Sequence, residues 1–472
     1  MPEAAAVSAS QTAIDFAYLV TGVCFILGLR YMSHPKTARV GNYISMAGMT
    51  IALIATGFML DFSGWWIGLI GLGAGAAVGI YSARAVKMTA MPQMVALFNG
   101  AGGGAAALVS TAEFLKLNPG IDPIPVDQGI TIVLSSIIGA ISFFGSIIAF
   151  LKLQELMTGR PITYPGQQFV NAIIAIAAVV CAGLVIANVA PVPAYFVAIV
   201  AASLLGVLFV LPIGGADMPV IISLLNSFTG LAAALTGFVL GNNVLIISGA
   251  LVGASGTLLT LMMGKAMNRS ITNVLFGAFG AVKEGAGGAA AGVTGGPIRE
   301  ATVDDVATML AYAKQVVVVP GYGMAVAQAQ HSVRELADQL EKHGVEVKYA
   351  IHPVAGRMPG HMNVLLAEAN VPYPALYDMD DINPEFPRTD VALIIGANDV
   401  TNPAARNVTS SPIYGMPILD VDKSHNVIVL KRSMKPGFAG IDNPLYELPN
   451  TAMLFGDAKA SIDKLVGAVK AL

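Results

Sequence analysis

Long apolar runs dominate the first 264 residues of the chain, and short polar segments separate them. A helix that crosses a bilayer needs about 20 mostly apolar residues, and these runs have that length. We therefore predict nine membrane-spanning helices in this part of the chain. Their expected ranges are residues 12–29, 41–60, 65–83, 94–114, 129–151, 169–189, 194–212, 220–240 and 244–264.

After a Gly-rich stretch at residues 277–296, short apolar runs alternate with helical stretches. Strands are expected at residues 315–319, 345–351, 391–395, 418–421, 427–430 and 453–455, and helices at residues 324–342, 361–369 and 459–472. Strands that alternate with helices predict a parallel sheet. The predicted fold class is an α-helical polytopic membrane domain (1–264), a Gly-rich linker (265–300) and an α/β Rossmann-like domain (301–472).

The distribution of charge supports this division. Residues 1–264 carry 16 charged side chains and residues 265–472 carry 39, so the two parts suit different solvents. The whole chain is 55% hydrophobic and 12% charged, which excludes a disordered chain and an ordinary cytosolic enzyme. The net charge of −3 gives no sign of a nucleic-acid partner. Cys24 and Cys181 lie in apolar runs and predict neither a disulfide framework nor a metal site.

Positive charges between the predicted helices set an orientation. With the N-terminus outside, the outward loops hold only Lys116, whereas the inward loops hold nine basic residues. These are Arg30, Lys36, Arg39, Arg84, Lys87, Lys152, Arg160, Lys265 and Arg269. Because Lys and Arg concentrate in cytoplasmic loops, we predict an outside N-terminus and a cytoplasmic C-terminal domain.

A buried strand that runs into Gly-x-Gly and then a helix is the clearest local motif of the second half. Residues 316–319 are all Val, and Gly321, Tyr322, Gly323, Met324, Ala325 and Val326 follow Pro320. The first glycine allows a tight turn and the second lets a pyrophosphate approach the backbone, near free N–H groups of the helix. Val326 replaces the third glycine of the usual fingerprint. The motif fits a dinucleotide site or an ordinary strand–helix turn.

The end of the second predicted strand bears on the choice of cofactor. An acidic residue there would bind the ribose of NAD, but this strand ends in His352 and Pro353, which leaves room for a 2′-phosphate. Lys431, Arg432 and Ser433 directly follow another strand. Arg offers a planar fork for phosphate and Lys a point charge. The alternative for these three residues is a solvated strand end.

Two further loops follow predicted strands, where open α/β sheets bind ligands. One contains Gly356, Arg357, Met358 and Gly360, and the other contains Gly396, Ala397, Asn398 and Asp399. Arg357 could pair with a pyrophosphate. Asp399 is a carboxylate near an expected anion, so its protonation could respond to the cofactor; the alternative is an Asx turn.

Polar side chains at membrane depth are costly and often functional. The candidates are Asn99, Ser146 and Asn226, and Asp217 lies in a short inward loop. Asn and Ser can hold a chain of water molecules but do not titrate at neutral pH. The alternative for the three membrane residues is hydrogen bonding that joins helices.

Several of these motifs occur in an order that resembles the β subunit of proton-translocating NAD(P) transhydrogenase, and the resemblance covers essentially the whole chain. The matching stretches are residues 215–220, 265–270, 351–357, 396–399 and 431–434. The resemblance implies that this chain binds NADP(H) and that an α subunit binds NAD(H). A hydride then passes between them, driven toward NADPH by inward proton flow. It also implies a bacterial inner membrane and a hetero-oligomer with two copies of this chain.

The resemblance also implies roles for particular residues. Lys431, Arg432 and Ser433 would hold the 2′-phosphate, residues 321–326 would line the dinucleotide, and Asp399 would be the coupling carboxylate. Ser146 and Asn226 match positions on the family's proton path. Many relatives have His where this chain has Asn99, and asparagine does not titrate. We therefore expect the proton acceptor on a helix of the partner subunit, with Asn99 orienting water.

Two other classes of protein share this layout. A transporter or channel with a nucleotide-sensing cytosolic domain would bind nucleotide without hydride exchange, although transporters often show repeats and charged midplane sites that are not evident here. A membrane anchor for a soluble dehydrogenase would show no proton dependence. It would also need a catalytic arrangement, and no convincing one is found in the sequence.

Overall fold

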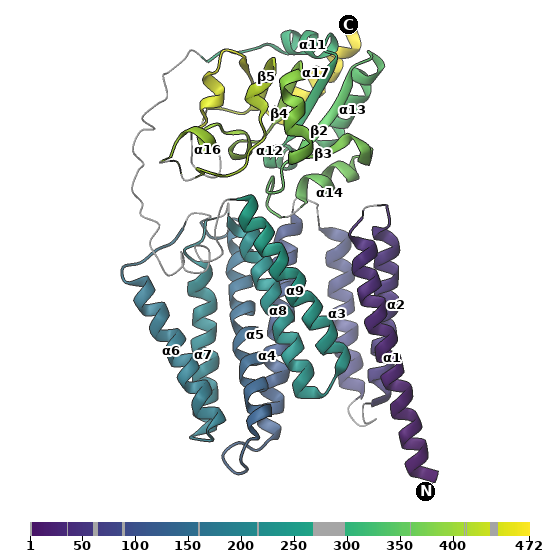
Figure 1. Cartoon of the computed structure of the whole chain (residues 1–472), viewed down its shortest axis with the longest axis vertical. Helices are drawn as coiled ribbons and strands as arrows, with labels where there is room; N and C mark the ends of the chain where they lie inside the picture. The colour runs from purple at the N-terminus through teal and green to yellow at the C-terminus, as the bar shows by residue number, and fades with distance from the viewer. Residues whose placement is uncertain are drawn as a thin grey trace.

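The computed structural model describes residues 2–34, 36–59, 65–86, 90–158, 161–214, 217–267, 298–358, 360–409, 411, 413–434 and 442–472. Within these ranges, nine helices are long and apolar enough to cross a membrane, as predicted. They are α1 (Pro2–Met32), α2 (Ala38–Met59), α3 (Trp65–Ala85), α4 (Met91–Lys116), α5 (Val126–Leu153), α6 (Gln167–Ile186), α7 (Pro191–Val210), α8 (Met218–Leu240) and α9 (Asn243–Ala266). Figure 1 shows them as a bundle beneath the C-terminal domain.

Small residues bring the helices α8 and α9 into backbone contact. A Cβ atom added to Gly230 would lie 2.4 Å from the backbone nitrogen of Gly253, and one added to Gly249 would lie 2.3 Å from that of Ala234. Lipid gives no hydrophobic drive between helices, so close packing of small residues holds them together. The Gly-rich last span therefore serves close helix approach in this structure.

The sequence predicted that Lys152 lies in an inward loop, but in the structure it is part of a helix. It lies in the last turn of α5 and is 2% exposed. Its Nζ donates to the carbonyls of Val210 and Ile213, at 3.3 and 2.8 Å, and to that of Leu211. A buried ammonium needs such acceptors, and this one ties the end of α5 to the end of α7 and to the residues that follow it.

Among the residues that the structure describes, the C-terminal domain contains a six-stranded parallel sheet in the order β3-β2-β1-β4-β5-β6. The strands are β1 (Gln315–Pro320), β2 (Glu346–Ile351), β3 (Leu376–Asp378), β4 (Val391–Ile395), β5 (Asn426–Lys431) and β6 (Thr451–Phe455). The predicted Rossmann-like fold is thus confirmed. In Figure 1 this sheet lies on the side of the bundle opposite the N-terminal end of α1.

Alternate residues of the central strands face two separate cores. Val316 and Val318 pack with the apolar faces of the helices, whereas Val317 and Val319 pack with residues such as Phe386 and Tyr446. Because both faces of the sheet are covered, the sequences of these strands are continuous apolar runs. The helices of the first core are α11 (Val303–Ala311), α13 (Gln330–Lys342), α14 (His361–Glu368) and α17 (Ala458–Ala471).

The prediction of a single helix at residues 324–342 is wrong, because the structure has two helices in this region. A short helix, α12 (Tyr322–Val326), ends before α13 begins, and Gln328 between them has φ of +53°. A left-handed residue cannot continue a right-handed helix. The chain therefore turns directly after the Gly-x-Gly loop.

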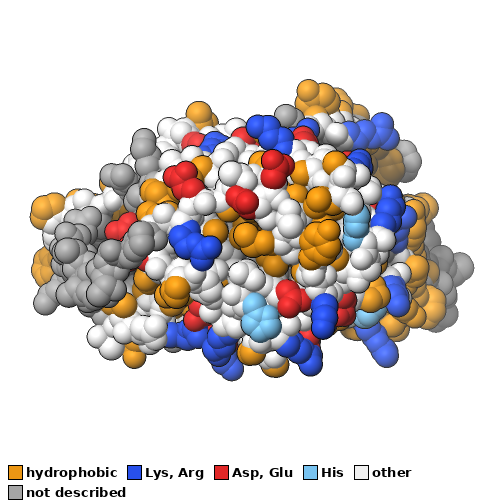
Figure 2. All heavy atoms as spheres, turned by 90° about the horizontal axis from the view of Figure 1, so that it is seen from above, with side chains coloured by type: hydrophobic (Ala, Val, Ile, Leu, Met, Phe, Trp, Pro, Cys, Tyr) orange, Lys and Arg blue, Asp and Glu red, His pale blue; other side chains and the backbone are white. Residues whose placement is uncertain are grey.

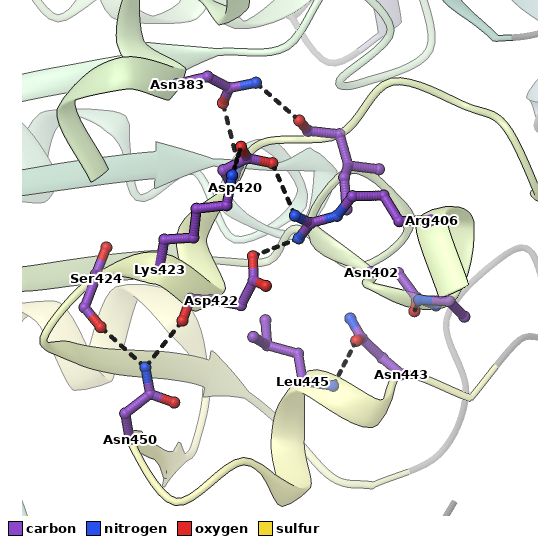
Figure 3. Close-up of polar contacts among 12 residues, drawn as sticks. Asn383, Asn402, Arg406, Asp420, Asp422, Lys423, Ser424, Asn443, Leu445 and Asn450 are labelled. Atoms are coloured by element: carbon purple, nitrogen blue, oxygen red, sulfur yellow. Dashed lines mark hydrogen bonds and ion pairs between the residues drawn. The ribbon is translucent and has the colours of Figure 1, made fainter. Parts of the chain in front are cut away.

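The strand predicted at residues 418–421 is also wrong. Both sides of β4 and of β5 are already paired within the sheet, and residues 421–423 form a 3-10 turn, η7. Side chains fix this segment instead: Arg406 pairs with Asp420 at 3.2 Å and with Asp422 at 2.5 Å (Figure 3). The Leu419 N–H also donates to the Val400 carbonyl at 2.9 Å.

The predicted Gly-rich linker falls mostly outside the described residues. The chain is described again from Ile298, and Arg299 and Ala301 form backbone hydrogen bonds with Met453 of β6. On the outer face of the domain, Lys and Arg side chains are interspersed with Asp and Glu (Figure 2), as on a solvated surface.

Candidate functional site

The predicted binding residues follow four strands whose carboxyl ends meet at one edge of the sheet. These strands are β1, β2, β4 and β5. In the observed strand order the winding reverses between β1 and β4. Open α/β sheets bind ligands outside the carboxyl ends of the strands at such a reversal. The loops after β1 and β4 therefore mark the candidate site.

These two loops press together through Gly321, Gly323, Gly396 and Ala397, which we call the glycine seam. A Cβ atom on Gly321 would lie 2.3 Å from Ala397 Cα, and one on Gly323 would lie 2.7 Å from Gly396 Cα. The N–H groups of Gly321 and Gly323 donate to the carbonyls of Ile395 and Gly396, at 2.9 and 3.0 Å. The glycines thus let two loops meet, and these two amides are already paired. Met324 and Ala325 are buried behind the seam, and Val326 is 48% exposed.

Asp399 lies directly after the seam in a polar network. Its Oδ1 accepts from Asn398 Nδ2 at 3.1 Å. Asn398 Oδ1 in turn accepts from Tyr446 Oη at 2.7 Å and Asn443 Nδ2 at 3.3 Å. Burial raises the pKa of the Asp399 carboxyl to about 6, although Lys431 and the Asn398 hydrogen bond oppose this shift. With that pKa the Asp399 carboxyl changes its charge near neutral pH, and its response to a cofactor stays a prediction.

The basic residues at the carboxyl end of β5 lie beside this network. Lys431 Nζ is 4.7 Å from the centre of the Tyr446 ring, and burial lowers the pKa of Lys431 while Asp442 and Asp399 raise it. Arg432 and Ser433 are exposed, and Arg432 approaches Asp457 at 3.8 Å. A lysine, an exposed arginine and a hydroxyl are donors that suit a phosphate. Lys431, Arg432 and Ser433 thus lie together at this edge of the sheet, and their contact with a phosphate stays a prediction.

Arg357 makes a contact that the sequence did not predict. Its guanidinium stacks 4.3 Å from the Tyr322 ring and donates to the Leu153 carbonyl at 3.1 Å and to Glu155 Oε1 at 3.0 Å. Leu153 is the last residue of α5, and Glu155 follows that helix. The side chain thus joins the C-terminal domain to the end of α5, and its contact with a pyrophosphate stays a prediction.

The rest of this loop is shaped around His361, which the sequence did not single out. Gly356 has φ of +109°, and a Cβ atom there would lie 2.5 Å from His361 Nδ1, which accepts the Arg357 N–H at 3.1 Å. Burial, followed by the nearby Arg357 charge, lowers the pKa of His361 to about 4. The Met358 carbonyl accepts from His361 N–H, and Gly360, with φ of +67°, begins α14. The shape of this loop and the hydrogen bond to the neutral His361 thus fix the position of the Arg357 backbone.

In the membrane domain, Asn99 and Ser146 meet as members of one buried network. Asn99 Nδ2 donates to Ser146 Oγ at 2.9 Å, which joins α4 to α5. Ser142, which the sequence reading missed, bonds Thr229 Oγ1 at 2.6 Å and the Leu225 carbonyl at 2.9 Å, which adds α8. The hydroxyls of Ser142 and Thr229 could have been found from their spacing along apolar helices.

The other two membrane candidates lie apart from this pair. Asn226 is half-buried on α8, and it forms no hydrogen bond with the Asn99 network among the residues that the structure describes. Asp217 precedes the first turn of α8. Within the described residues, no group of His, Cys, Asp and Glu is arranged to hold a metal ion.

Within the described residues, nine long apolar helices and a parallel sheet of Rossmann type indicate a multi-pass membrane protein with a Rossmann-like domain. A model of the family described as NAD(P) transhydrogenase beta subunit matches residues 14–468. Two proteins from Rhodospirillum rubrum named NAD(P) transhydrogenase subunit beta, one of them from a designated strain, are 51% identical over 461 residues, covering 96% of this chain and 98% of theirs. The chain therefore belongs to the NAD(P) transhydrogenase beta subunit family, and the predicted family and enzyme class are confirmed.

Proposed function

We propose that this chain binds NADP(H) at the carboxyl edge of β4 and β5 and exchanges a hydride with NAD(H) held by an α subunit. We further propose that the exchange is coupled to inward proton movement across a bacterial inner membrane. The soluble domain then lies in the cytoplasm and the N-terminus outside, in a hetero-oligomer with two copies of this chain. One observation carries the proposal: a buried carboxylate that can titrate, Asp399, lies beside the donor Lys431 at a dinucleotide-type switch point.

The residues present fit a 2′-phosphorylated dinucleotide. Lys431, Arg432 and Ser433 would hold the 2′-phosphate, because together they offer point charge, a planar fork and a hydroxyl. The glycine seam and Asn398 would shape the site for the remainder of the dinucleotide. When bound, NADP(H) supplies the hydride chemistry. The protein then needs to position the cofactor and exclude water rather than supply a general base.

The hydrogen-bonded network around Asn99 in the membrane domain supports the proposal of a proton path. Asn99 Oδ1 is buried and has no hydrogen-bond partner among the described residues, so it can accept a hydrogen bond from a water molecule. Neither Asn99 nor Ser146 titrates at neutral pH. The group that takes up the proton is then on a helix of the partner subunit. A partner with no His, Asp or Glu at membrane depth, in a complex that still pumps, would contradict this assignment.

The phosphate assignment predicts the cofactor preference of the full chain. Replacing both Lys431 and Arg432 with Ala is expected to weaken NADP(H) binding by about a hundredfold, because two charge-assisted hydrogen bonds are lost, and to leave NAD(H) binding unchanged. Calorimetric titration of the purified full-length chain with each cofactor measures this. Lys464→Ala, on an exposed part of α17, is the matched control and should bind as the unmodified chain does.

The same titration separates the competing interpretations. Preference of the unmodified chain for NAD(H), or no binding of either cofactor, would contradict the proposed site. Binding of NADP(H) without hydride exchange in the presence of the NAD(H)-binding partner would instead favour a transporter with a nucleotide-sensing domain.

A further inference from the structure

A cavity of about 250 Å³ lies between α1 and α9, and we call it the α1–α9 cavity. The turn between α8 and α9 is at the end of the bundle away from the C-terminal domain (Figure 1), and the cavity lies beside this turn. Three polar and three apolar side chains line it: Asp15, Tyr18, Asn243, Leu19, Ile246 and Ile247. None of them belongs to the candidate cofactor site or to the network around Asn99.

The polar side chains of the cavity lie where the apolar spans begin. The span of α1 starts at Thr12, three residues before Asp15, and Asn243 is the first residue of α9. Leu19 is four residues further along α1 than Asp15, and Ile246 is three residues further along α9 than Asn243. At 1.5 Å per residue these steps are about 6 and about 5 Å into the span. The cavity is therefore polar near the membrane surface and apolar below it, as a phospholipid is.

The buried member of the lining is Tyr18, which is 5% exposed. Its Oη bonds Thr56 Oγ1 of α2 at 3.0 Å and accepts from Asn242 Nδ2, in the turn before α9, at 3.3 Å. Tyr18 also packs with Val244 of α9. These contacts join the pair of helices α1 and α2 to α9, so a molecule in the cavity would bridge the same junction.

The size and the exposure of the cavity fit part of a lipid. At about 30 Å³ for each molecule of liquid water, its volume corresponds to about eight water molecules. A headgroup and the first part of an acyl chain need that much room, whereas a helix is about 10 Å across and does not fit. Leu19 is 60% exposed, and Asp15 and Asn243 are exposed as well, so a ligand can enter directly from the lipid.

The two exposed polar side chains favour one kind of headgroup. Asp15 is a carboxylate, and a primary ammonium can donate charge-assisted hydrogen bonds to it. The quaternary ammonium of choline has no N–H to donate, and an anionic headgroup would be repelled. The amide of Asn243 can donate to a phosphate oxygen. Charge and hydrogen bonding therefore match a zwitterionic headgroup that ends in a primary ammonium.

We propose that the α1–α9 cavity binds one phospholipid with a primary-ammonium headgroup. The ammonium lies at Asp15, the phosphate lies at Asn243, and the start of an acyl chain lies along Leu19, Ile246 and Ile247. In the proposed orientation of the chain, this lipid belongs to the outer leaflet. It stabilises the junction at which α1 and α2 meet α9.

Native mass spectrometry of the purified full-length chain tests the site. The chain is mixed with equal amounts of phosphatidylethanolamine, phosphatidylcholine and phosphatidylglycerol, all with dioleoyl chains. The unmodified chain is expected to retain phosphatidylethanolamine about fivefold more than either other lipid, the factor that an exposed ion pair contributes. Asp15→Asn should remove this preference and Asp15→Glu should keep it. Asp127→Asn changes an exposed carboxylate in the first turn of α5 and is the matched control, with no expected change.

A second variant keeps the proposal testable if Asp15→Asn does not fold. Leu19→Trp fills the apolar part of the cavity from its exposed side and should lower the retention of phosphatidylethanolamine. Soluble phosphoethanolamine, which has the headgroup without the chains, should not displace the lipid. Equal retention of the three lipids, or an unchanged result in Asp15→Asn or Leu19→Trp, would overturn the proposal. Displacement by soluble phosphoethanolamine or by the α subunit would overturn it as well. These results do not depend on hydride exchange, so the proposal can fail while the proposed function stands.

Discussion

Replacing Gly321 with Ala is expected to destabilise the soluble domain by about 1–3 kcal/mol and to abolish measurable NADP(H) binding. The added Cβ atom would lie 2.3 Å from Ala397 Cα, from its backbone nitrogen and from the Gly396 carbonyl oxygen. All three are backbone atoms, so no side chain can rotate away and the two loops must separate. Thermal unfolding and cofactor titration of the full-length chain measure the two effects.

A helical glycine with free space around it is the control for this substitution. Gly467 lies inside α17, and an added Cβ atom there meets nothing within 4 Å. Gly467→Ala should therefore be neutral or stabilise the domain by up to about 1 kcal/mol, since Ala has the higher helix propensity. The Gly321→Ala variant could instead unfold at the same temperature as the unmodified chain and bind NADP(H) normally. That result would contradict the close packing at the glycine seam.

The affinity of the full-length chain for NADP(H) is expected to fall by about tenfold as the pH rises from about 5 to about 8, and Asp399→Asn is expected to remove this dependence. Burial raises the pKa of Asp399 to about 6. Below that pH the carboxyl is neutral and tolerates an anionic cofactor; above it the carboxylate repels phosphate. Asparagine is neutral throughout, so the variant should bind at pH 8 as tightly as the unmodified chain does at pH 5.

Titrations of both proteins across this pH range test the sign as well as the size of the effect. Asp338→Asn, on α13, changes a carboxylate that pairs with Arg334 on the same helix and should retain the pH dependence. An unchanged slope in Asp399→Asn, or an affinity that rises with pH in the unmodified chain, would contradict the role of Asp399. We also expect Asp399→Asn to lower the number of protons moved per hydride.

Much of the architecture could be predicted because it depends on local pattern. Runs of about 20 apolar residues commonly form membrane-spanning helices. The central strands of the sheet are continuous apolar runs. The predictions that were wrong or missing also concern short segments of the chain. β3 is three residues long and pairs with β2, so its pattern is too short to recognise. The run at residues 418–421 is largely apolar, like a strand, but β4 and β5 are already paired on both sides.

The candidate site could be predicted only in part, for a similar reason. Parallel strands bring their carboxyl ends to one edge, so Asp399 and Lys431 could be placed together from the sequence. Tyr446 and Asn443 complete the network around Asn398, but they come from a loop before β6 that has no recognisable motif. The contact of Arg357 with Leu153 joins residues 204 positions apart, across two domains, and no periodicity encodes it.

Proton movement during hydride exchange tests the account most directly. The chain and the proposed NAD(H)-binding α subunit are placed in sealed vesicles with the C-terminal domain outward, and NADPH formation from NADH is followed together with the internal pH. The account predicts that the interior becomes alkaline as NADPH forms and that an imposed proton gradient, acid inside, accelerates the reaction. Hydride exchange at full rate with a constant internal pH and no response to the gradient would contradict it.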